Sequence, residues 1–499
     1  MALPDGYIPP NVQPKCSWSL GKRKNECPHQ EMIKKPKNIP DQILPNVLEM
    51  IGQTPMIRLD KIAKAEGLKC DLLAKCEFFN ASGSVKDRIG LRMVEEAERS
   101  GMLKPGDTLI EPTSGNTGIS IALTAAVRGY KCVIVMPERM SEEKVSVIKA
   151  LGAEIVRTPS AASFKNAESH FGVAFKLKNE IPNSHVLDQY RNAGNALAHY
   201  DGTGNEILEQ TGGKVDMVII GTGSGGTVCG VGRKIKEVYP NCKIVGFDPY
   251  GSLMAEPEEL NKTEIKSYLI EGTGHDFIPT VLDRSVIDEW YKVDDKESFN
   301  CARRLIKEEG LLCGGTSGAA LSVALRAAKN LKAGQKCVVL LPDSIRNYLS
   351  RFASDDWMIE HGFMDPPAAD RQWWWDKPLT ELKLRDSHIS PDTTCSQAVS
   401  YMKAESLTEV PIVSDDRIVL GIAKLSDIVQ KLFTGKCSSE DTVQRTRQYK
   451  KVEQSATLKR LYDMVVKSEY AVVVKPGSQE FIGVATLFEL AEYSETCKK

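Results

Sequence analysis

The sequence predicts an α/β protein, with parallel sheets covered by helices in one large domain and a smaller duplicated α/β module after it. Two observations carry this prediction. From about residue 41 to residue 350, short β-rich apolar runs alternate with helical stretches, and helices are the usual connections between parallel strands. In residues 381–499 a weak repeat has Gly421 and Gly483 at matching positions, 62 residues apart, which predicts a duplicated module.

Individual elements of the large domain follow from local patterns. Ser141, followed by Glu142 and Glu143, predicts a helix start that ends near Gly152, because acidic residues favour the first turn of a helix. Further helices are expected at 119–127 and 227–238. A buried strand is expected at 132–136, and further strands are expected at 154–158, 215–220, 243–247 and 338–341.

Composition limits the class of protein. The chain has 499 residues, 41% hydrophobic and 26% charged, with a formal net charge of -1. No basic field favours nucleic acid or membrane partners, no apolar run is long enough to span a bilayer, and no secretory leader is visible. The 13 cysteines are odd in number and form no CxxC pair. They predict buried free thiols in a reducing, cytoplasmic location.

Four segments are expected. Residues 1–40 are rich in proline and polar residues and predict an arm outside the folded domain. Residues 41–350 form the large domain, and residues 381–499 the repeat. Residues 351–380 predict a linker because Pro366 and Pro367 interrupt the pattern. The three tryptophans 373–375 are expected to pack on a neighbouring domain rather than face water.

Lys86, in the stretch SGSVKDRIG, stands between a flexible loop and a predicted helix. A cation there is on the unfavourable end of the helix dipole. The simplest interpretation is a solvated surface lysine. The alternative is a Schiff-base lysine, because the positive potential of a helix start lowers the pKa of the amine toward its nucleophilic form.

Two more small-residue turns, 111–118 and 221–227, precede predicted helices and favour anion binding. For the second turn a phosphate cradle, a dinucleotide fingerprint completed by Asp248 and a purely structural turn all stay open. A fourth turn, 313–318, either contacts a ligand or begins a helix with Thr316 or Ser317 as N-cap.

Seven motifs occur in order along the chain: SGSVKDR, EPTSGNTG, LDQYRNAGN, GSGGT, DPYGS, AEPEELNKT and LLCGGTSG. In these motifs the chain resembles the cystathionine β-synthase family. The members of this family are pyridoxal-phosphate enzymes of the tryptophan-synthase-β (type II) fold. The resemblance covers nearly the whole chain. It is closest to the animal form, with an N-terminal haem arm (1–40), a catalytic domain (41–350) and a C-terminal tandem pair of CBS modules (381–499).

The resemblance implies a role for individual residues. Lys86 would form the Schiff base with pyridoxal 5'-phosphate, and Asn116 would bind its ring hydroxyl oxygen. Thr316, where the family usually has serine, would face the pyridine nitrogen, and Tyr190 would lie near the ring. The expected phosphate cradle is Gly223, Ser224, Gly225, Gly226 and Thr227. The expected contacts to the substrate carboxylate are Thr113, Ser114, Thr117 and Gln189.

The arm is similar to the family's haem-binding segment. The resemblance implies Cys16 and His29 as axial ligands of haem b, with Arg233 next to the Cys16 thiolate. Cys27 is a competing ligand. The absence of CxxCH argues against covalent haem attachment.

The implied activity is a β-replacement in which L-serine and L-homocysteine form cystathionine, with Lys86 as general base, hydrogen sulfide production as a side activity and a homodimer or larger homo-oligomer as the assembly. Cysteine synthase, serine/threonine dehydratase and a haem or redox sensor without turnover are the alternatives. His275 replaces an expected tyrosine. The modules carry Lys424 with Asp427 and Thr486 with Glu489, neither a complete adenosyl motif, which disfavours binding of S-adenosylmethionine.

Overall fold

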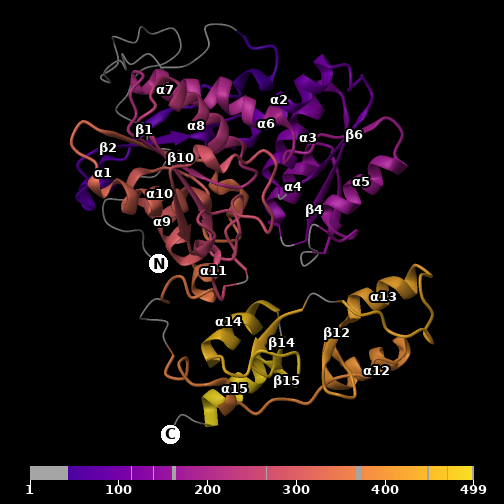
Figure 1. Ribbon diagram of the computed structural model, residues 1–499. Helices are drawn as coiled ribbons and strands as arrows, with labels where there is room; N and C mark the ends of the chain where they lie inside the picture. Colours follow the sequence, from indigo (N-terminus) through magenta and orange to yellow (C-terminus); the bar gives the residue numbers. More distant parts are fainter. Residues whose placement is uncertain are drawn as a thin grey trace, which may run out of the picture. The chain divides into compact units, whose positions relative to one another are not determined.

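The computed structural model describes residues 43–113, 115–138, 140–159, 165–265, 267–366, 372–446, 449–468 and 470–496 (Figure 1). The chain divides into two units, residues 1–49 and 50–499. The short 3-10 helix η2 (Val47–Met50) includes the point of division, and it begins where the Asn46 side chain accepts from the Leu48 amide. The predicted arm, 1–40, lies outside the described residues.

A six-stranded sheet is the larger of the two sheets in residues 50–350. Its order is β1 (Met56–Arg58), β2 (Asp71–Cys76), β10 (Lys336–Leu341), β7 (Met217–Gly221), β8 (Lys243–Pro249) and β9 (Glu289–Val293). β1 is antiparallel to β2, and the other neighbours are parallel. The two central strands, β10 and β7, are apolar on both faces, as is typical where helices cover both sides of a parallel sheet.

Alternate residues of each strand belong to different cores, as the period of a strand requires. Val339 and Leu341 pack in the core on the side of α1 (Asp60–Ala65), α9 (Asp295–Glu309) and α10 (Gly315–Ala327). Val338 and Leu340 pack in the core on the side of α7 (Asn205–Thr211) and α8 (Gly226–Val238). In Figure 1, α10 lies next to β10, against which it packs, and α8 packs against β7 and β8.

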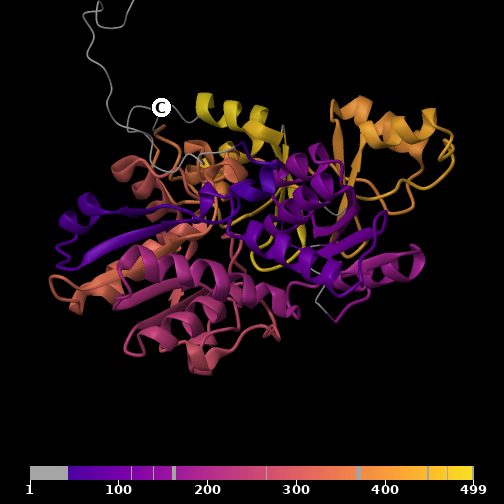
Figure 2. The ribbon, with the colours of Figure 1, turned by 90° about the horizontal axis from the view of Figure 1, so that it is seen from above.

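The second sheet is fully parallel, in the order β5 (Glu154–Thr158), β4 (Lys131–Pro137), β3 (Thr108–Pro112) and β6 (Ser184–Val186). It packs with α2 (Lys86–Arg99), α3 (Asn116–Arg128), α4 (Glu142–Ala150) and α5 (His170–Glu180). Figure 2 shows these helices around the strands from a second direction. The predicted alternation of strands and helices is confirmed, with errors of a few residues at the ends of elements. For example, the strand expected at 215–220 is β7, which begins two residues later, at Met217.

One long helical stretch connects the two sheets. α6 (Ala193–Ala198) continues through a π-helical turn, η4 (His199–Gly204), into α7. Such turns are uncommon and are frequent at functional sites.

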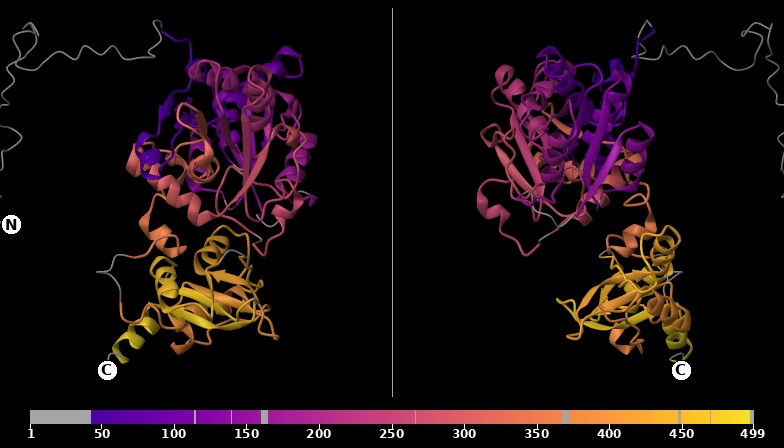
Figure 3. Two further views of the ribbon diagram at one scale, coloured as in Figure 1. Left: turned by 60° about the vertical axis from the view of Figure 1, so that its left-hand side comes forward. Right: turned by 90° about the vertical axis from the view of Figure 1, so that its right-hand side faces the viewer.

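The C-terminal region is a duplicated α/β module, as predicted. One copy contains α12 (Cys395–Glu405), β11 (Glu409–Val413), β12 (Val419–Lys424) and α13 (Leu425–Phe433); the other contains β13 (Lys451–Glu453), α14 (Leu458–Ser468), β14 (Tyr470–Val474), β15 (Phe481–Thr486) and α15 (Leu487–Thr496) (Figure 3). Gly421 pairs with Ile412 and Gly483 with Val473, and each pairing immediately precedes a register shift. The matching irregularity supports duplication.

Residues 351–380 are more structured than a linker prediction suggests. Phe352 and Met358, the latter in α11 (Asp355–Glu360), are buried in the core around α9 and α10. Trp374 and Trp375 are buried in the core of the second module copy, as expected, whereas Trp373 is 45% exposed. None of the helices in the described ranges combines the length and apolar character that crossing a membrane requires.

Candidate active site

A pocket opens where the first turns of α2, α3, α8 and α10 approach the carboxyl ends of β7 and β10. This is the edge at which parallel α/β sheets bind ligands. The predicted site residues that line this pocket are Lys86, Asn116, Thr117, Gln189, Tyr190, Gly223, Ser224, Gly225, Thr227 and Thr316. Segments separated by more than 200 residues in sequence therefore meet around one cavity.

Lys86 is the first residue of α2, and its side chain lines the pocket. The loop before it is fixed to the segment after β10, because the Val85 amide donates to the Pro342 carbonyl at 2.7 Å. Asp87 accepts from the Ser82 amide at 2.6 Å. Burial lowers the pKa of Lys86 to about 8, while the Asp343 carboxylate opposes this shift. The lowered pKa expected from the helix start is thus present, but burial is its main cause.

Asn116, the first residue of α3, is held at both ends of its amide. Its nitrogen donates to Asp343 Oδ2 at 2.8 Å, and its oxygen accepts from Asn347 at 3.0 Å. An amide nitrogen has two protons. The amide nitrogen thus has a second proton beyond the one it donates to Asp343.

The glycine loop after β7 needs its glycines. Gly225 has φ of 90°, in the left-handed region, and directly precedes α8. A Cβ on Gly226 would lie 1.8 Å from the Asn195 amide oxygen. This loop contains no cationic side chain, so an anion bound there would be held by amide and hydroxyl donors and by the start of α8.

The dinucleotide interpretation of this loop is not supported. Asp248, the acidic residue at the right spacing, is fully buried and forms an ion pair with Lys292 at 2.7 Å. Its other oxygen accepts from the Met254 amide. The carboxylate is therefore committed to the protein interior and does not reach the loop's ligand.

Two of the four residues expected to contact the substrate carboxylate line the pocket. The Thr117 hydroxyl donates to the Gln189 side chain at 2.8 Å, and both line the pocket. Thr113 is buried and accepts from the Gly115 amide, but it is not among the pocket-lining residues. Ser114 lies outside the described residues.

At the fourth small-residue turn, Gly314 is the N-cap of α10. The alternative that Thr316 or Ser317 caps this helix is therefore wrong. Thr316 instead lines the pocket, and its hydroxyl donates to the Glu271 carbonyl at 2.6 Å.

Sequence reasoning missed the charged wall of the pocket. Lys144 of α4 forms a buried ion pair with Glu271 at 2.6 Å, and Arg351 approaches the other Glu271 oxygen at 3.3 Å. Asp343, buried and hydrogen-bonded to Tyr348 at 2.5 Å, completes this wall. Burial raises the pKa of Asp343. One feature of the sequence could have indicated Asp343. It follows the predicted strand 338–341 at its carboxyl end, where parallel sheets bind ligands.

His275 lies at the rim, as expected for a residue bordering the site. Its ring meets the Tyr190 ring edge-on, with centroids 5.1 Å apart, and Phe277 lies 5.0 Å away on the same side. The His275 amide donates to Ser252 Oγ at 3.0 Å. The position of the His275 backbone is thus set by the neighbouring segment.

Of the predicted haem residues, only Arg233 is in the described part. It extends from α8 and pairs with Asp283 at 2.7 Å. Cys16, Cys27 and His29 lie outside the described residues.

An amine of lowered pKa and an anion-binding glycine loop on one pocket fit an aldehyde that carries a phosphate. The class defined in this way is that of the pyridoxal-phosphate dependent enzymes, whose family model matches residues 47–343. A CBS domain model matches residues 381–434.

Similar proteins indicate which family of pyridoxal-phosphate dependent enzymes includes this chain. The chain is 53% identical to the cystathionine beta-synthase of Rattus norvegicus, over 94% of this chain and 84% of the relative. It is 49% identical to that of Dictyostelium discoideum, over 97% and 98%. The chain belongs to the cystathionine β-synthase family of pyridoxal-phosphate dependent enzymes.

Among solved structures, an O-ureido-L-serine synthase is similar with a TM-score of 0.58 and 34% identity, covering 66% of this chain and 98% of that chain. A hydrogen sulfide-producing enzyme from Fusobacterium nucleatum is similar with a TM-score of 0.57 and 36% identity, covering 62% and 100%. The neighbours support the type II fold of the catalytic region.

Proposed function

We propose that this protein condenses L-serine with L-homocysteine to form cystathionine. The observation that carries the proposal is the placement of Lys86 and the Gly223–Thr227 loop on one pocket, in a chain whose relatives across 94–97% of its length are cystathionine β-synthases. Pyridoxal 5'-phosphate, when bound, supplies the electron sink for a carbanion at Cα of serine.

Lys86 acts as the general base in this proposal. A pKa of about 8 leaves part of the population neutral near neutral pH, so its Nζ can remove the Cα proton of serine. The Lys86 ammonium gives this proton to the serine β-hydroxyl, which leaves as water. The neutral amine then takes the thiol proton of homocysteine as its sulfur forms the new bond to Cβ, and it returns that proton to Cα.

Other residues orient the reactants. Asn116 would bind the cofactor's ring hydroxyl oxygen through its amide, and Thr316 would hold the side of the pyridine nitrogen. Tyr190 would pack near the ring. The phosphate would be held by Gly223, Ser224, Gly225, Gly226 and Thr227. The substrate carboxylate would be held by Thr117 and Gln189, together with Thr113 and Ser114.

The test is a product assay on purified protein. Serine plus homocysteine should yield cystathionine, and O-acetylserine plus sulfide or serine alone should be poorer reactions, which separates the proposal from cysteine synthase and dehydratase. Lys86→Ala should abolish cystathionine formation and the absorption of the lysine-linked cofactor, while Lys104→Ala, an exposed control, should retain both. Full turnover by Lys86→Ala would exclude this assignment, and absence of any wild-type turnover would favour a haem or redox sensor.

Hydrogen sulfide production is proposed as a side activity, because cysteine in place of serine would lose its β-thiol as hydrogen sulfide while the homocysteine sulfur forms the new bond to Cβ. The solved neighbour described as hydrogen sulfide-producing supports this extension. His275 at the rim is the residue to vary, with the ratio of sulfide to cystathionine as the readout.

From the sequence resemblance we also propose that Cys16 and His29 bind haem b, with Arg233 near the Cys16 thiolate. A Soret absorption band that shifts in Cys16→Ser but not in Cys27→Ser supports it, and a colourless protein would reject it.

A cytoplasmic homodimer or larger homo-oligomer is proposed on the same basis; the free thiols of the described ranges suit a reducing compartment. Calorimetric titration tests the expectation that S-adenosylmethionine does not regulate the modules.

A further inference from the structure

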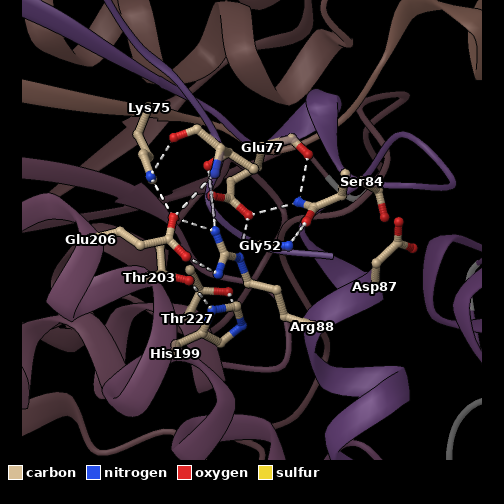
Figure 4. Close-up of polar contacts among 12 residues, drawn as sticks. Gly52, Lys75, Glu77, Ser84, Asp87, Arg88, His199, Thr203, Glu206 and Thr227 are labelled. Carbon is tan, nitrogen blue, oxygen red and sulfur yellow. Dashed lines mark hydrogen bonds and ion pairs between the residues drawn. The ribbon is translucent and has the colours of Figure 1, made fainter. Parts of the chain in front are cut away.

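Behind the glycine loop, two buried side chains hold its two hydroxyl residues. Asn195 and His199 stand four residues apart, where α6 passes into the π turn, and therefore face the same way. The Asn195 amide nitrogen donates to Ser224 Oγ at 2.8 Å. His199 Nε2 lies 3.1 Å from Thr227 Oγ1 (Figure 4).

The direction of the first hydrogen bond is determined by a third group. The Asn195 nitrogen also donates to the Gln189 carbonyl at 2.7 Å, and a carbonyl can only accept. The nitrogen is therefore the atom that faces Ser224, and Ser224 Oγ accepts there. The Ser224 proton is left to point elsewhere, and Ser224 lines the pocket.

The second hydrogen bond belongs to a chain of three groups. His199 Nδ1 lies 2.9 Å from Thr203 Oγ1, and His199 is fully buried. Burial, with the positive charges of Lys86 and Arg88, holds the pKa of His199 well below its usual range, while Glu206 opposes this weakly. The ring is neutral, so one nitrogen donates and the other accepts.

We propose that Asn195 and His199 are positioning residues that orient the hydroxyls of Ser224 and Thr227 as donors to the cofactor phosphate. A phosphate dianion only accepts hydrogen bonds, so each hydroxyl must donate to it. The chain then runs from Thr203 O–H to His199 Nδ1, from His199 Nε2–H to Thr227 Oγ1, and from Thr227 O–H to the phosphate. This inference rests on the proposed cofactor-dependent function and goes beyond it by assigning residues that do not touch the cofactor.

The arrangement matters because the loop holds its anion without a cation of its own. Neutral donors bind an anion only when their protons point at it. The supporting helix cannot shift easily, since a Cβ on Gly230 of α8 would lie 2.2 Å from the Ala196 carbonyl. The two helices are in close backbone contact, which fixes the distance from His199 to Thr227.

Binding of two aldehydes tests the proposal: pyridoxal 5'-phosphate and pyridoxal, which lacks the phosphate. The full-length protein is stripped of cofactor and retitrated. His199→Asn keeps a polar group toward Thr203 but withdraws the donor from Thr227, so affinity for pyridoxal 5'-phosphate should fall about 10- to 100-fold. Affinity for pyridoxal should stay within about twofold, since no phosphate contact is lost.

His199→Gln is the matched control, because its amide nitrogen can take the place of Nε2. It should stay within about threefold of wild type for both aldehydes. Asn195→Asp, which can no longer donate to Ser224, should show the same phosphate-selective loss as His199→Asn. Equal weakening of both aldehydes in the Asn195 and His199 variants would overturn the proposal and assign these residues to folding alone. A wild-type chain that binds neither aldehyde would instead reject the proposed function.

The tautomer is tested independently by nitrogen NMR of histidine-labelled holoenzyme, which contains seven histidines. His199 should show a protonated Nε2 and an unprotonated Nδ1 from about pH 5.5 to about pH 8, where an ordinary histidine titrates. Thr203→Val, which removes the donor to Nδ1, should shift this tautomer and weaken pyridoxal 5'-phosphate selectively by about three- to tenfold. The opposite tautomer in wild type would overturn the proposal even if His199→Asn did not fold.

Discussion

The amide of Asn116 donates to the carboxylate of Asp343 at 2.8 Å, joining the start of α3 to the segment that follows β10. The Tyr348 hydroxyl donates to the same carboxylate oxygen at 2.5 Å. Asp343 is thus held in the pocket wall, where its charge acts on Lys86.

The first prediction concerns this charge. Asp343→Asn should move the pKa of Lys86 below about 8, because the carboxylate stabilises the ammonium form and its removal favours the neutral amine. The measurement is the pH dependence of Lys86 acylation in cofactor-free protein, with Lys86→Ala as the blank and the exposed Asp356→Asn as the control. A midpoint that is unchanged or raised would contradict the prediction.

The second prediction concerns the glycine loop. Gly226→Ala should abolish binding of pyridoxal 5'-phosphate, because the added Cβ would lie 1.8 Å from the Asn195 amide oxygen and the loop must move. Gly212→Ala is the control, since a Cβ there meets nothing within 4 Å. It should lower stability by about 1 kcal/mol through its positive φ and leave cofactor affinity unchanged. Wild-type affinity in Gly226→Ala would mean that the loop tolerates displacement.

The third prediction concerns the buried charge network beneath α2 (Figure 4). Glu206 pairs with Arg88 and Lys75, both at 2.6 Å. Burial raises the pKa of Glu206, but these two cations outweigh it and bring the pKa to about 2. Glu206→Gln should lower the free energy of unfolding by about 3 kcal/mol at neutral pH, because the buried Lys75 loses its ion-pair partner and Arg88 keeps only Glu77 as a carboxylate partner.

The pH dependence of that loss follows from the depressed pKa. The contribution of Glu206 is complete above about 4.5, the ordinary value of a glutamate, and is lost as pH falls toward about 2. The difference between wild type and Glu206→Gln in denaturant unfolding should therefore shrink below that value. The exposed Glu209→Gln, on the same helix, should show little difference at any pH. A constant difference for Glu206→Gln would refute the ion-pair explanation.

The fourth prediction concerns the second module copy. Glu489 accepts from the Thr486 amide at 2.7 Å and from its hydroxyl at 2.5 Å, and it pairs with Arg385. The carboxylate therefore stabilises the start of α15 rather than standing free. Glu489→Ala should destabilise this helix by about 1–3 kcal/mol, seen as faster hydrogen exchange over residues 487–496. Glu492→Ala, on the exposed face, should leave exchange unchanged, and equal exchange in both variants would contradict the assignment.

The elements that sequence predicts well are those whose patterns are local. The strand 154–158 was expected with the bounds of β5, because a short run rich in β-branched residues favours a strand. The duplicated module followed from matched glycines. Trp373 was expected to be buried like Trp374 and Trp375, but it is 45% exposed. The reason is that burial of each ring depends on whether another part of the folded chain packs against it.

The site divides in the same manner. The sequence predicted Lys86 and the loop 223–227 because an anion-binding turn requires particular residue types in one short stretch, and Lys86 and four residues of this loop line one pocket. Asp343, Glu271 and His199 were not found. Each occurs in an ordinary local pattern, and each acquires its partners from a segment far away in the chain.

The sequence by itself determined the α/β class, the small-residue turns and the position of Lys86 at a helix start. Only the tertiary structure decided that Lys86 is tuned mainly by burial, that Asp248 is paired with Lys292 and that two buried side chains support the glycine loop. The physical reason is that propensity and anion-binding turns are properties of neighbouring residues. Burial, ion pairing and hydrogen-bond direction are properties of the space that distant segments enclose together.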